Sequence, residues 1–419
     1  MPINVYAAFT VPVLLLVVAE VIYCLVKKNG YYTYQDSISS LGTAIVNQSV
    51  NLLVAAIFYP AYSFLSDLWQ IWHPAEKGFL YYSLLFIGID FLFYWFHRKG
   101  HTMNMLWAAH MPHHSTEEMN YAVALRASIT QRFFSFFFYW PLTLFFPAGD
   151  VLAMVAFHLV LQLIPHTRVI PKLPNWIESW MNTPSHHRVH HACNKCYIDK
   201  NYGGFLIIWD KIFGSYADEI EKPFYGVTTP PRTWDPTYIN LQWWWYLFSD
   251  SIQTKNWWDK IRLWFMPTGW RPSDLPPRKT YVYSHTVPTS EWPKFSSKEM
   301  PGTRAYTILS LFVCLGLMFL SINTDSPFTT AEKWAISLFL WVTCTCWSGF
   351  LESRTWAKPV EFIRIAVQAL LLTPLFNQYY PAYVGNLVIA FSVLQLIWLL
   401  QIHFFNNKLQ NSNNLNAAH

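Results

Sequence analysis

The sequence predicts an all-α, polytopic integral membrane protein with a histidine-rich site for two metal ions that faces the cytoplasm. Three observations predict this fold class. Several apolar runs are long enough to cross a bilayer as helices. Only 13% of the 419 residues are charged, against about 25% in soluble proteins, and 22 residues are Trp, which favours membrane interfaces. Eleven of the fifteen histidines lie between His97 and His191.

Residues 1–77 are predicted to form N-terminal membrane helices. The apolar run 5–26 lacks a basic front end and a cleavage site, so we expect an anchor rather than a signal peptide. Lys27 and Lys28 follow it and place that end in the cytoplasm by the positive-inside tendency. A second span is expected over 45–68. A third, over 78–96, then returns the chain to the cytoplasm at His97.

The histidines of the predicted catalytic core, residues 78–221, are expected to bind metal. Residues three or four apart share one face of a helix, so the HxxxH and HxxHH spacings present compact imidazole faces. Neutral imidazoles need partners for their lone pairs and protonated ones repel each other, and a metal ion resolves both problems. The set is too large for one ion and fits two. The predicted ligands are His97, His101, His110, His113, His114, His166, His187, His190 and His191.

Local signals in the core predict how these faces are built. Pro112 predicts a kink or a fresh helix start, with His113 and His114 in its first turn. The apolar stretches 133–146 and 151–164 are short for a full crossing and predict a hairpin that dips into the membrane. Residues 182–185 predict a helix N-cap followed by Pro184 at the first helical position.

Five further residues are expected to support the ligands. Glu117, Asn182 and Asp199 are candidate acceptors that fix imidazole tautomers. Gln162 is a candidate to hold a metal-bound water, whereas His158 on the same face is expected to be a hydrogen-bonded core residue. His186 points about 100° away from its neighbour on the helix, so we expect it to support the site rather than to bind metal.

The rest of the chain is predicted to be scaffold. Residues 222–303 are rich in Trp and suggest a layer on the bilayer surface; a cytoplasmic cap without lipid contact is the alternative. Residues 304–405 hold up to four more spans, at 304–321, 334–351, 362–375 and 384–405, and 406–419 is expected to be a disordered polar tail. Without a basic run, no nucleic-acid partner is expected. The single Cys193-x-x-Cys196 motif is interpreted as incidental.

The all-histidine set is compatible with zinc or iron. Breaking an unactivated C–H bond needs a redox metal, dioxygen and two electrons, and zinc has no redox role. A histidine cluster at the foot of apolar helices therefore favours two iron ions and oxygen chemistry on a membrane lipid.

The histidine motifs resemble those of the fatty acid hydroxylase and sterol desaturase superfamily, and within it those of the alkylglycerol monooxygenases. The similar parts are Asp90-x-x-x-Tyr94-Trp95-Phe96-His97-Arg98, His113-His114-Ser115-x-Glu117, Ala124-Leu125-Arg126, His166-Thr167, and residues 182–191, 198–202 and 206–214. The chain departs from the family pattern at Thr102 and Arg168, where the family has glutamate, and Pro112 is also atypical.

The resemblance implies an ether-lipid monooxygenase. The nine histidines would hold two iron ions, dioxygen would be consumed, tetrahydrobiopterin would supply electrons, and a reductase or a pterin-recycling protein would be a partner. The membrane would be the endoplasmic reticulum in a eukaryote or the inner membrane in a bacterium. Two alternatives stay open: another lipid, sterol or fatty acid hydroxylase or desaturase with a cytochrome or ferredoxin donor, and a histidine-rich metal transporter.

Overall fold

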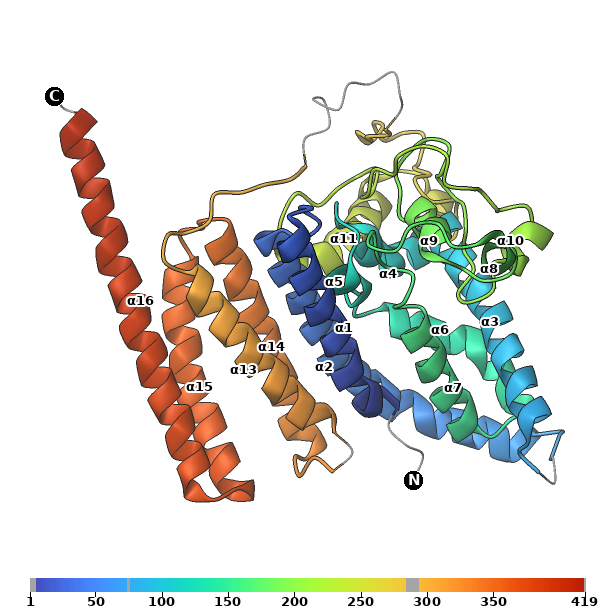
Figure 1. The fold of residues 1–419 in the computed structure, drawn as a ribbon, viewed down its shortest axis with the longest axis horizontal. Helices are drawn as coiled ribbons and strands as arrows, with labels where there is room; N and C mark the ends of the chain where they lie inside the picture. Colours follow the sequence, from blue (N-terminus) through green and yellow to red (C-terminus); the bar gives the residue numbers. More distant parts are fainter. Residues whose placement is uncertain (1–4, 74–75, 284–293, 324, 418–419) are drawn as a thin grey trace.

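The computed structural model describes residues 5–73, 76–283, 294–323 and 325–417, and its regular elements there are helical apart from isolated β-bridges (Figure 1). This confirms the all-α prediction. The helices are α1 (Val5–Lys27), α2 (Tyr34–Trp69), α3 (Phe79–Thr102), α4 (Asn104–His114), α5 (Tyr121–Ala124), α6 (Gln131–Tyr139), η1 (Trp140–Leu144), α7 (Ala148–Leu161), α8 (Asn175–Glu178), α9 (Pro184–His190), α10 (Ile208–Ile212), α11 (Pro236–Gln253), α12 (Trp257–Arg262), α13 (Arg304–Ile322), α14 (Thr330–Leu351), α15 (Ala357–Tyr379) and α16 (Ala382–Ala417).

The described helices make this a multi-pass membrane protein. Five of them are long and apolar enough to cross a bilayer, namely α3, α13, α14, α15 and the part of α16 up to Ile402. A sixth span is α2 if its two halves, bent by 47°, count as one. These helices agree with the six spans that were predicted to begin at residues 45, 78, 304, 334, 362 and 384. α1 also forms a helix over the range predicted as the first span.

The two apolar stretches after the second histidine group form the arms of the expected hairpin. α6 and η1 run away from the histidine-bearing helices and α7 returns, with both arms between α1 and α3 in Figure 1. Apolar side chains of α3, α6 and α7 share one buried cluster that includes Ile89, Phe136 and Val151. The hairpin therefore holds α3, which carries the first two histidines, against the rest of the core.

The helix start predicted at Pro112 is wrong. α4 begins at Asn104 and continues through Pro112 to His114, so the proline lies in the last turn rather than the first. A proline there removes one backbone hydrogen bond of the helix, but the helix ends two residues later, so little helix is left to disrupt. All three histidines of the second group consequently lie on one helix.

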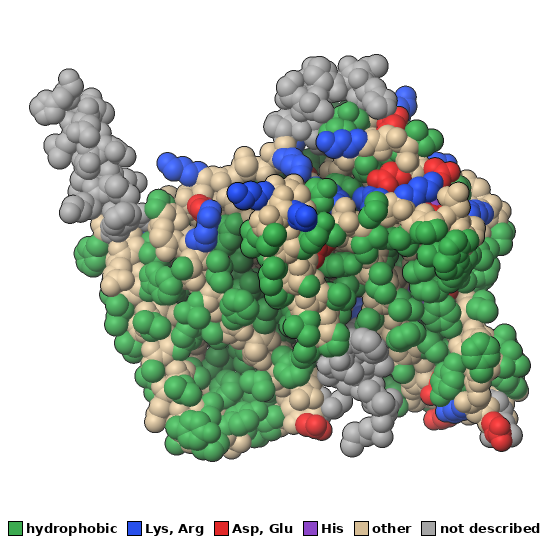
Figure 2. All heavy atoms as spheres, in the orientation of Figure 1, with side chains coloured by type: hydrophobic (Ala, Val, Ile, Leu, Met, Phe, Trp, Pro, Cys, Tyr) green, Lys and Arg blue, Asp and Glu red, His purple; other side chains and the backbone are tan. Residues whose placement is uncertain are grey.

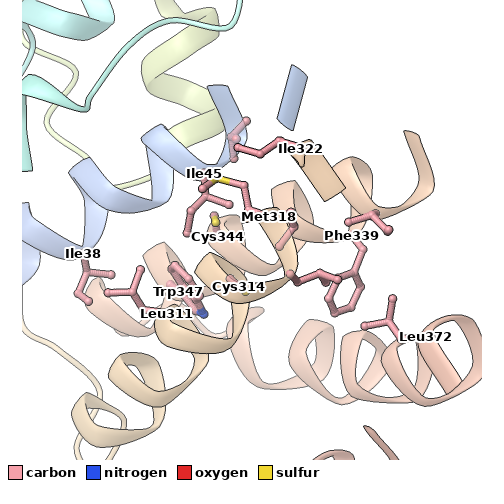
Figure 3. Close-up of a cluster of buried hydrophobic side chains, with 14 of the residues drawn as sticks. Ile38, Ile45, Leu311, Cys314, Met318, Ile322, Phe339, Cys344, Trp347 and Leu372 are labelled. Atoms are coloured by element: carbon pink, nitrogen blue, oxygen red, sulfur yellow. The ribbon is translucent and has the colours of Figure 1, made fainter. Parts of the chain in front are cut away.

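α13 and α14 pack against α2, α15 packs on α14, and side chains of all four helices share one apolar core. Ile45 of α2, Met318 of α13 and Trp347 of α14 meet in this cluster (Figure 3). α16 packs beside α15. The expected disorder of residues 406–419 is contradicted up to Ala417, because α16 continues that far. The chain has no Gly or Pro between Gly385 and its end to stop the helix.

The Trp-rich segment lies on the same side of the molecule as the histidine-bearing ends of α3 and α4. α11 packs on α4, and Trp243 is buried in that contact. Trp245, Trp257 and Trp258 are exposed. Exposed indole rings beside an apolar belt suit the headgroup level of a bilayer, so the predicted interfacial layer stays the preferred interpretation.

Candidate metal centre

Three helices and one turn deliver the nine predicted ligands. His97 and His101 lie in the last turns of α3, and the second group lies in the last turns of α4. The third group lies on α9, whose N-cap Thr183 is followed by Pro184 as predicted. His166 comes from the turn after α7. All of these elements end at the same level of the molecule, so their imidazoles converge.

The imidazoles form two adjacent groups. Within each group, one ligand nitrogen per residue lies within 4.8 Å of those of the others. The groups touch, since the rings of His114 and His191 stack with their centroids 4.2 Å apart. Both α4 and α9 contribute to both groups, as expected for a two-ion site. The first group is His97, His101, His110, His114 and His190, and the second is His113, His166, His187 and His191.

Backbone carbonyls orient four of the rings. The Nδ1–H groups of His97 and His113 donate to Tyr202 O at 2.7 Å and Arg126 O at 2.8 Å. Those of His166 and His190 donate to the carbonyl oxygens of Gln162 at 2.8 Å and Lys200 at 3.0 Å. A neutral imidazole that donates through Nδ1 carries a lone pair on Nε2. All four rings therefore offer Nε2 as a metal ligand.

These lone pairs face one another. Two lone pairs repel unless a proton or a cation lies between them, so their spacing shows whether the residues fit a metal ion. His113 Nε2 and His166 Nε2 are 3.2 Å apart although both rings donate through Nδ1. Burial lowers the pKa of His113 to about 4, so protonation does not supply the missing positive charge at neutral pH. Neighbouring nitrogens about 2.1 Å from an octahedral ion lie about 3.0 Å apart. The spacing fits nitrogens that share a cation.

Other imidazole nitrogens in the two groups are also free to bind. His101 Nε2, His190 Nε2 and His191 Nε2 are buried, with no hydrogen-bond partner in the described part of the chain. Burial lowers the pKa of His190 to about 3. A buried nitrogen without a partner costs about 1–3 kcal/mol, and a metal ion removes that cost.

Two buried aspartates that the sequence analysis missed hold the loop behind the rings. Asp90 of α3 accepts hydrogen bonds from Phe205 N at 2.7 Å and His158 Nε2 at 2.6 Å. Asp210 accepts from the backbone nitrogens of Tyr202 at 2.8 Å and Gly203 at 2.7 Å. These bonds place the Tyr202 carbonyl against His97. An ionisable residue inside an apolar span is itself a signal of function, so Asp90 was detectable.

The three acceptors predicted from the sequence contact other groups. Glu117 accepts from Phe295 N at 2.6 Å and lies 3.7 Å from Arg232 Nη1. Asn182 donates to Gly203 O at 2.6 Å. Asp199 is hydrogen-bonded to the Tyr202 side chain. Carbonyls replace these three side chains because the loops after α5 and α9 bring the backbone itself to the rings.

The remaining supporting residues also differ in detail. The Gln162 side chain donates to His158 Nδ1 at 2.6 Å, so its backbone oxygen, not its amide, reaches the site. His158 is a hydrogen-bonded core residue, as expected. His186 closes a capping box with Thr183 and lies 3.1 Å from Glu178, which anchors the start of α9. Both cysteines of the CxxC motif carry free thiols.

An apolar cavity of about 440 Å³ opens onto this centre from the membrane side. Leu41 of α2, Val155 of α7 and Phe319 of α13 line its walls. Five imidazoles line it, and they come from both groups: His97, His110, His113, His166 and His187. A hydrocarbon chain in this cavity would therefore meet both candidate metal positions.

Comparison with known proteins agrees with the histidine motifs. A family model described as fatty acid hydroxylase matches residues 82–215. Alkylglycerol monooxygenase from Homo sapiens is 31% identical over 371 residues, which cover 87% of this chain and 81% of the relative. The chain belongs to the alkylglycerol monooxygenase family. The Danio rerio member is 33% identical over 360 residues, covering 85% of this chain and 79% of the relative.

The family assignment confirms the resemblance found in the sequence. A more distant relative, ornithine lipid hydroxylase OlsE from Rhizobium tropici, is 26% identical over 182 residues, or 41% of this chain and 52% of the relative. No solved structure matches the chain significantly.

Proposed function

We propose that this protein is a di-iron lipid monooxygenase that hydroxylates the alkyl carbon next to the ether oxygen of alkylglycerol lipids. The observation that carries the proposal is the apolar cavity that ends on imidazoles of both histidine groups. The alkylglycerol monooxygenase relatives support the choice of substrate class. The product is a hemiacetal, which separates into a fatty aldehyde and a glycerol derivative.

The chemistry requires an oxidant and a reductant. One dioxygen molecule, two electrons and two protons are consumed; one oxygen atom enters the C–H bond and the other leaves as water. Two iron ions held by the nine histidines would supply the redox chemistry that zinc lacks. The chain itself would hold the substrate beside them, so that a bimolecular step becomes effectively unimolecular.

The cavity walls suit an amphiphile with a long tail. Its far end is lined by Leu315, Met318 and Phe319 of α13, which runs away from the histidine level (Figure 1). Its polar lining includes Gln131 of α6 and Asn51 of α2, whose Oδ1 is buried without a partner in the described residues. A glycerol hydroxyl that donates to this oxygen would fix the head and hence the carbon that is presented.

The proposal is tested with the purified full-length chain in detergent or nanodiscs. We expect about two iron ions per chain and oxygen-dependent release of fatty aldehyde, with label from ¹⁸O₂ in the hemiacetal hydroxyl before it exchanges with water. Iron-loaded protein that consumes oxygen but releases no aldehyde from alkylglycerols contradicts the substrate. Metal uptake into liposomes without oxygen consumption supports the transporter alternative instead.

Tetrahydrobiopterin is the proposed electron donor, with a reductase or a pterin-recycling protein as partner. Thr102 and Arg168 occupy the two positions where the family pattern has glutamate. Thr102 bonds back to Arg98 O at 2.9 Å, and Arg168 pairs with Glu118 at 2.5 Å. Screening reduced pterin against a cytochrome and a ferredoxin separates this donor from those of the other hydroxylases and desaturases of the superfamily.

The histidine level is proposed to face the cytoplasm, in the endoplasmic reticulum of a eukaryote or the inner membrane of a bacterium. Lys and Arg side chains gather above the apolar belt, on the side where α3 ends (Figures 1 and 2). Cytoplasmic loops carry such an excess.

Labelling of Cys196 tests this orientation. Cys196 is exposed on that side, whereas the other five cysteines are buried. We expect a membrane-impermeant maleimide to label the protein in vesicles only when the cytoplasmic face is outside. Cys196→Ser should abolish the signal. Labelling only in vesicles with the opposite face outside would contradict the proposed orientation.

Phe319 of α13 is expected to limit the length of the alkyl chain. Its ring lines the apolar cavity, so Phe319→Ala should extend the space for the tail. Each additional buried methylene is worth about 0.8 kcal/mol, about fourfold in kcat/KM. We expect the preference to shift to longer chains by that factor per carbon. Phe312→Ala on the same helix, where the ring is 65% exposed, is the control and should leave the chain-length profile unchanged.

A further inference from the structure

A second cavity reaches the histidine cluster from the opposite direction. It has a volume of about 490 Å³ and is lined by residues from α3, α4, α9 and the segment after α9, and by residues of the segment 226–280, which contains α11. His101, His114, His190 and His191 form part of its wall. None of these four lines the apolar cavity, which instead contacts the other five imidazoles. The histidine cluster is therefore a partition between two separate spaces.

The wall of the second cavity carries more polar groups than that of the apolar cavity, and we call it the polar cavity. Asp250 of α11 accepts from Arg271 Nη2 at 2.7 Å and from Arg278 Nη2 at 2.9 Å, and all three residues line the space. Thr228 and Asp199 add further polar groups. These charged and polar groups make the lining less suited to an alkyl chain than that of the apolar cavity, because burying polar groups against hydrocarbon costs free energy.

Three buried polar groups in this wall have no partner in the described residues. They are Trp243 Nε1, Thr229 Oγ1 and Thr268 Oγ1. Trp243 is only 6% exposed and Thr229 only 8%. Each unpaired group costs about 1–3 kcal/mol. The cavity is thus built for an occupant that accepts a hydrogen bond from an indole N–H and bonds to hydroxyls.

Aromatic rings connect this wall to the imidazoles. The ring centroids of Trp243 and Trp107 are 6.3 Å apart, and those of Trp107 and His101 are 5.2 Å apart. Trp270 also lines the space. Flat aromatic walls favour a planar ring as ligand. An occupant here contacts the candidate metal ligands directly, so electrons need no additional carrier.

We propose that the polar cavity binds the organic reductant of the reaction, a small planar nitrogen heterocycle with hydrogen-bond donors and acceptors on its edge. The proposal rests on the monooxygenase function and on the tetrahydrobiopterin donor proposed above, and it adds the place where that donor binds. The reduced heterocycle gives up two electrons and two protons; with one dioxygen, the substrate C–H becomes C–OH and the second oxygen atom becomes water. The lipid and the reductant then approach from opposite sides of the partition and do not compete.

Equilibrium binding tests the assignment without turnover. The probe is 6-methyltetrahydropterin, titrated anaerobically into the iron-loaded full-length protein. Thr229→Val and Trp243→Phe each remove one hydrogen-bonding group at nearly constant shape. Loss of one hydrogen bond is worth about 1 kcal/mol, so each variant should weaken pterin binding about fivefold. Alkylglycerol binding should not change. Trp245→Phe, on the exposed face of the same helix, is the control and should match the wild type.

Kinetics provide a second readout. In both variants KM for the pterin should rise while KM for the lipid and kcat stay the same. Pterin affinity unchanged in both folded variants overturns the proposal and leaves a water-filled cavity. Competition between pterin and alkylglycerol overturns it in favour of a headgroup site. Aldehyde release that is supported by a ferredoxin, with no binding of the pterin, overturns it while leaving the monooxygenase function intact.

Discussion

His166→Ala is expected to remove one of two bound iron ions and nearly all monooxygenase activity. His166 belongs to the group of four imidazoles, and its Nε2 lies 2.9 Å from His187 Nε2 and 3.2 Å from His113 Nε2. The group of five does not include it, so that group keeps its ligands. Iron should fall from about two to about one per chain, as measured by mass spectrometry of the purified protein.

The activity loss should exceed that of a residue that only supports a ligand. Loss of a supporting residue typically costs 10–100-fold, so we expect His166→Ala to reduce aldehyde release by more than about 100-fold. His73→Ala is the control, because His73 lies exposed in the segment between α2 and α3. Full iron content in His166→Ala, or equal losses in both variants, would contradict the two-group assignment.

Asp90→Ala is expected to cost several kcal/mol of stability and to lower the iron content. The carboxylate accepts hydrogen bonds from His158 Nε2, Phe205 N, Leu206 N and Trp209 Nε1. Truncation leaves these buried donors unpaired, at about 1–3 kcal/mol each, against a total stability of about 5–15 kcal/mol. The loop that presents Tyr202 O to His97 should loosen. Thermal unfolding in detergent and metal analysis measure both effects.

Asp150→Ala, which also truncates an aspartate, is the control for Asp90→Ala. Asp150 at the start of α7 pairs with Lys77, whose side chain is 47% exposed, and accepts one further hydrogen bond, from the Tyr81 hydroxyl at 2.5 Å. An exposed pair contributes about 0–1 kcal/mol and one hydrogen bond about 1 kcal/mol, so the melting temperature of Asp150→Ala should fall much less than that of Asp90→Ala. Asp90→Asn, which keeps one acceptor oxygen, should fall between the two. A melting temperature of Asp90→Ala within a degree of that of Asp150→Ala would rule out the anchoring role.

Much of the fold follows from local sequence because the bilayer restricts the choice of structure. An apolar run about 20 residues long must form a helix, since backbone groups in hydrocarbon need internal partners. The spans from α2, α3 and α13 to α16 were predictable on this basis, as was the N-cap at Thr183. Pro112 was misinterpreted because its effect depends on where the helix began, and the start at Asn104 carries no strong capping signal.

The candidate ligands were predictable because histidines that recur three and four residues apart lie on one face of a helix, and this spacing is visible in the sequence. Their partners were not, because backbone carbonyls leave no trace in the side-chain sequence. Tyr202 O and Lys200 O reach His97 and His190 only after Asp90 and Asp210 fold the loop after α9. From side chains alone, this role was therefore expected of Glu117, Asn182 and Asp199.

The sequence by itself determined that this chain is an α-helical membrane protein with a large set of candidate metal ligands. Helical periodicity and runs of apolar residues are local patterns of the sequence, so they can be recognised without knowing the tertiary structure. Only the tertiary structure decided that His113 belongs with His166 rather than with its helix neighbour His114, and that an apolar and a polar cavity lie on opposite sides of the cluster. Both depend on how α3, α4, α7 and α9 pack, and packing joins residues that are distant in the sequence.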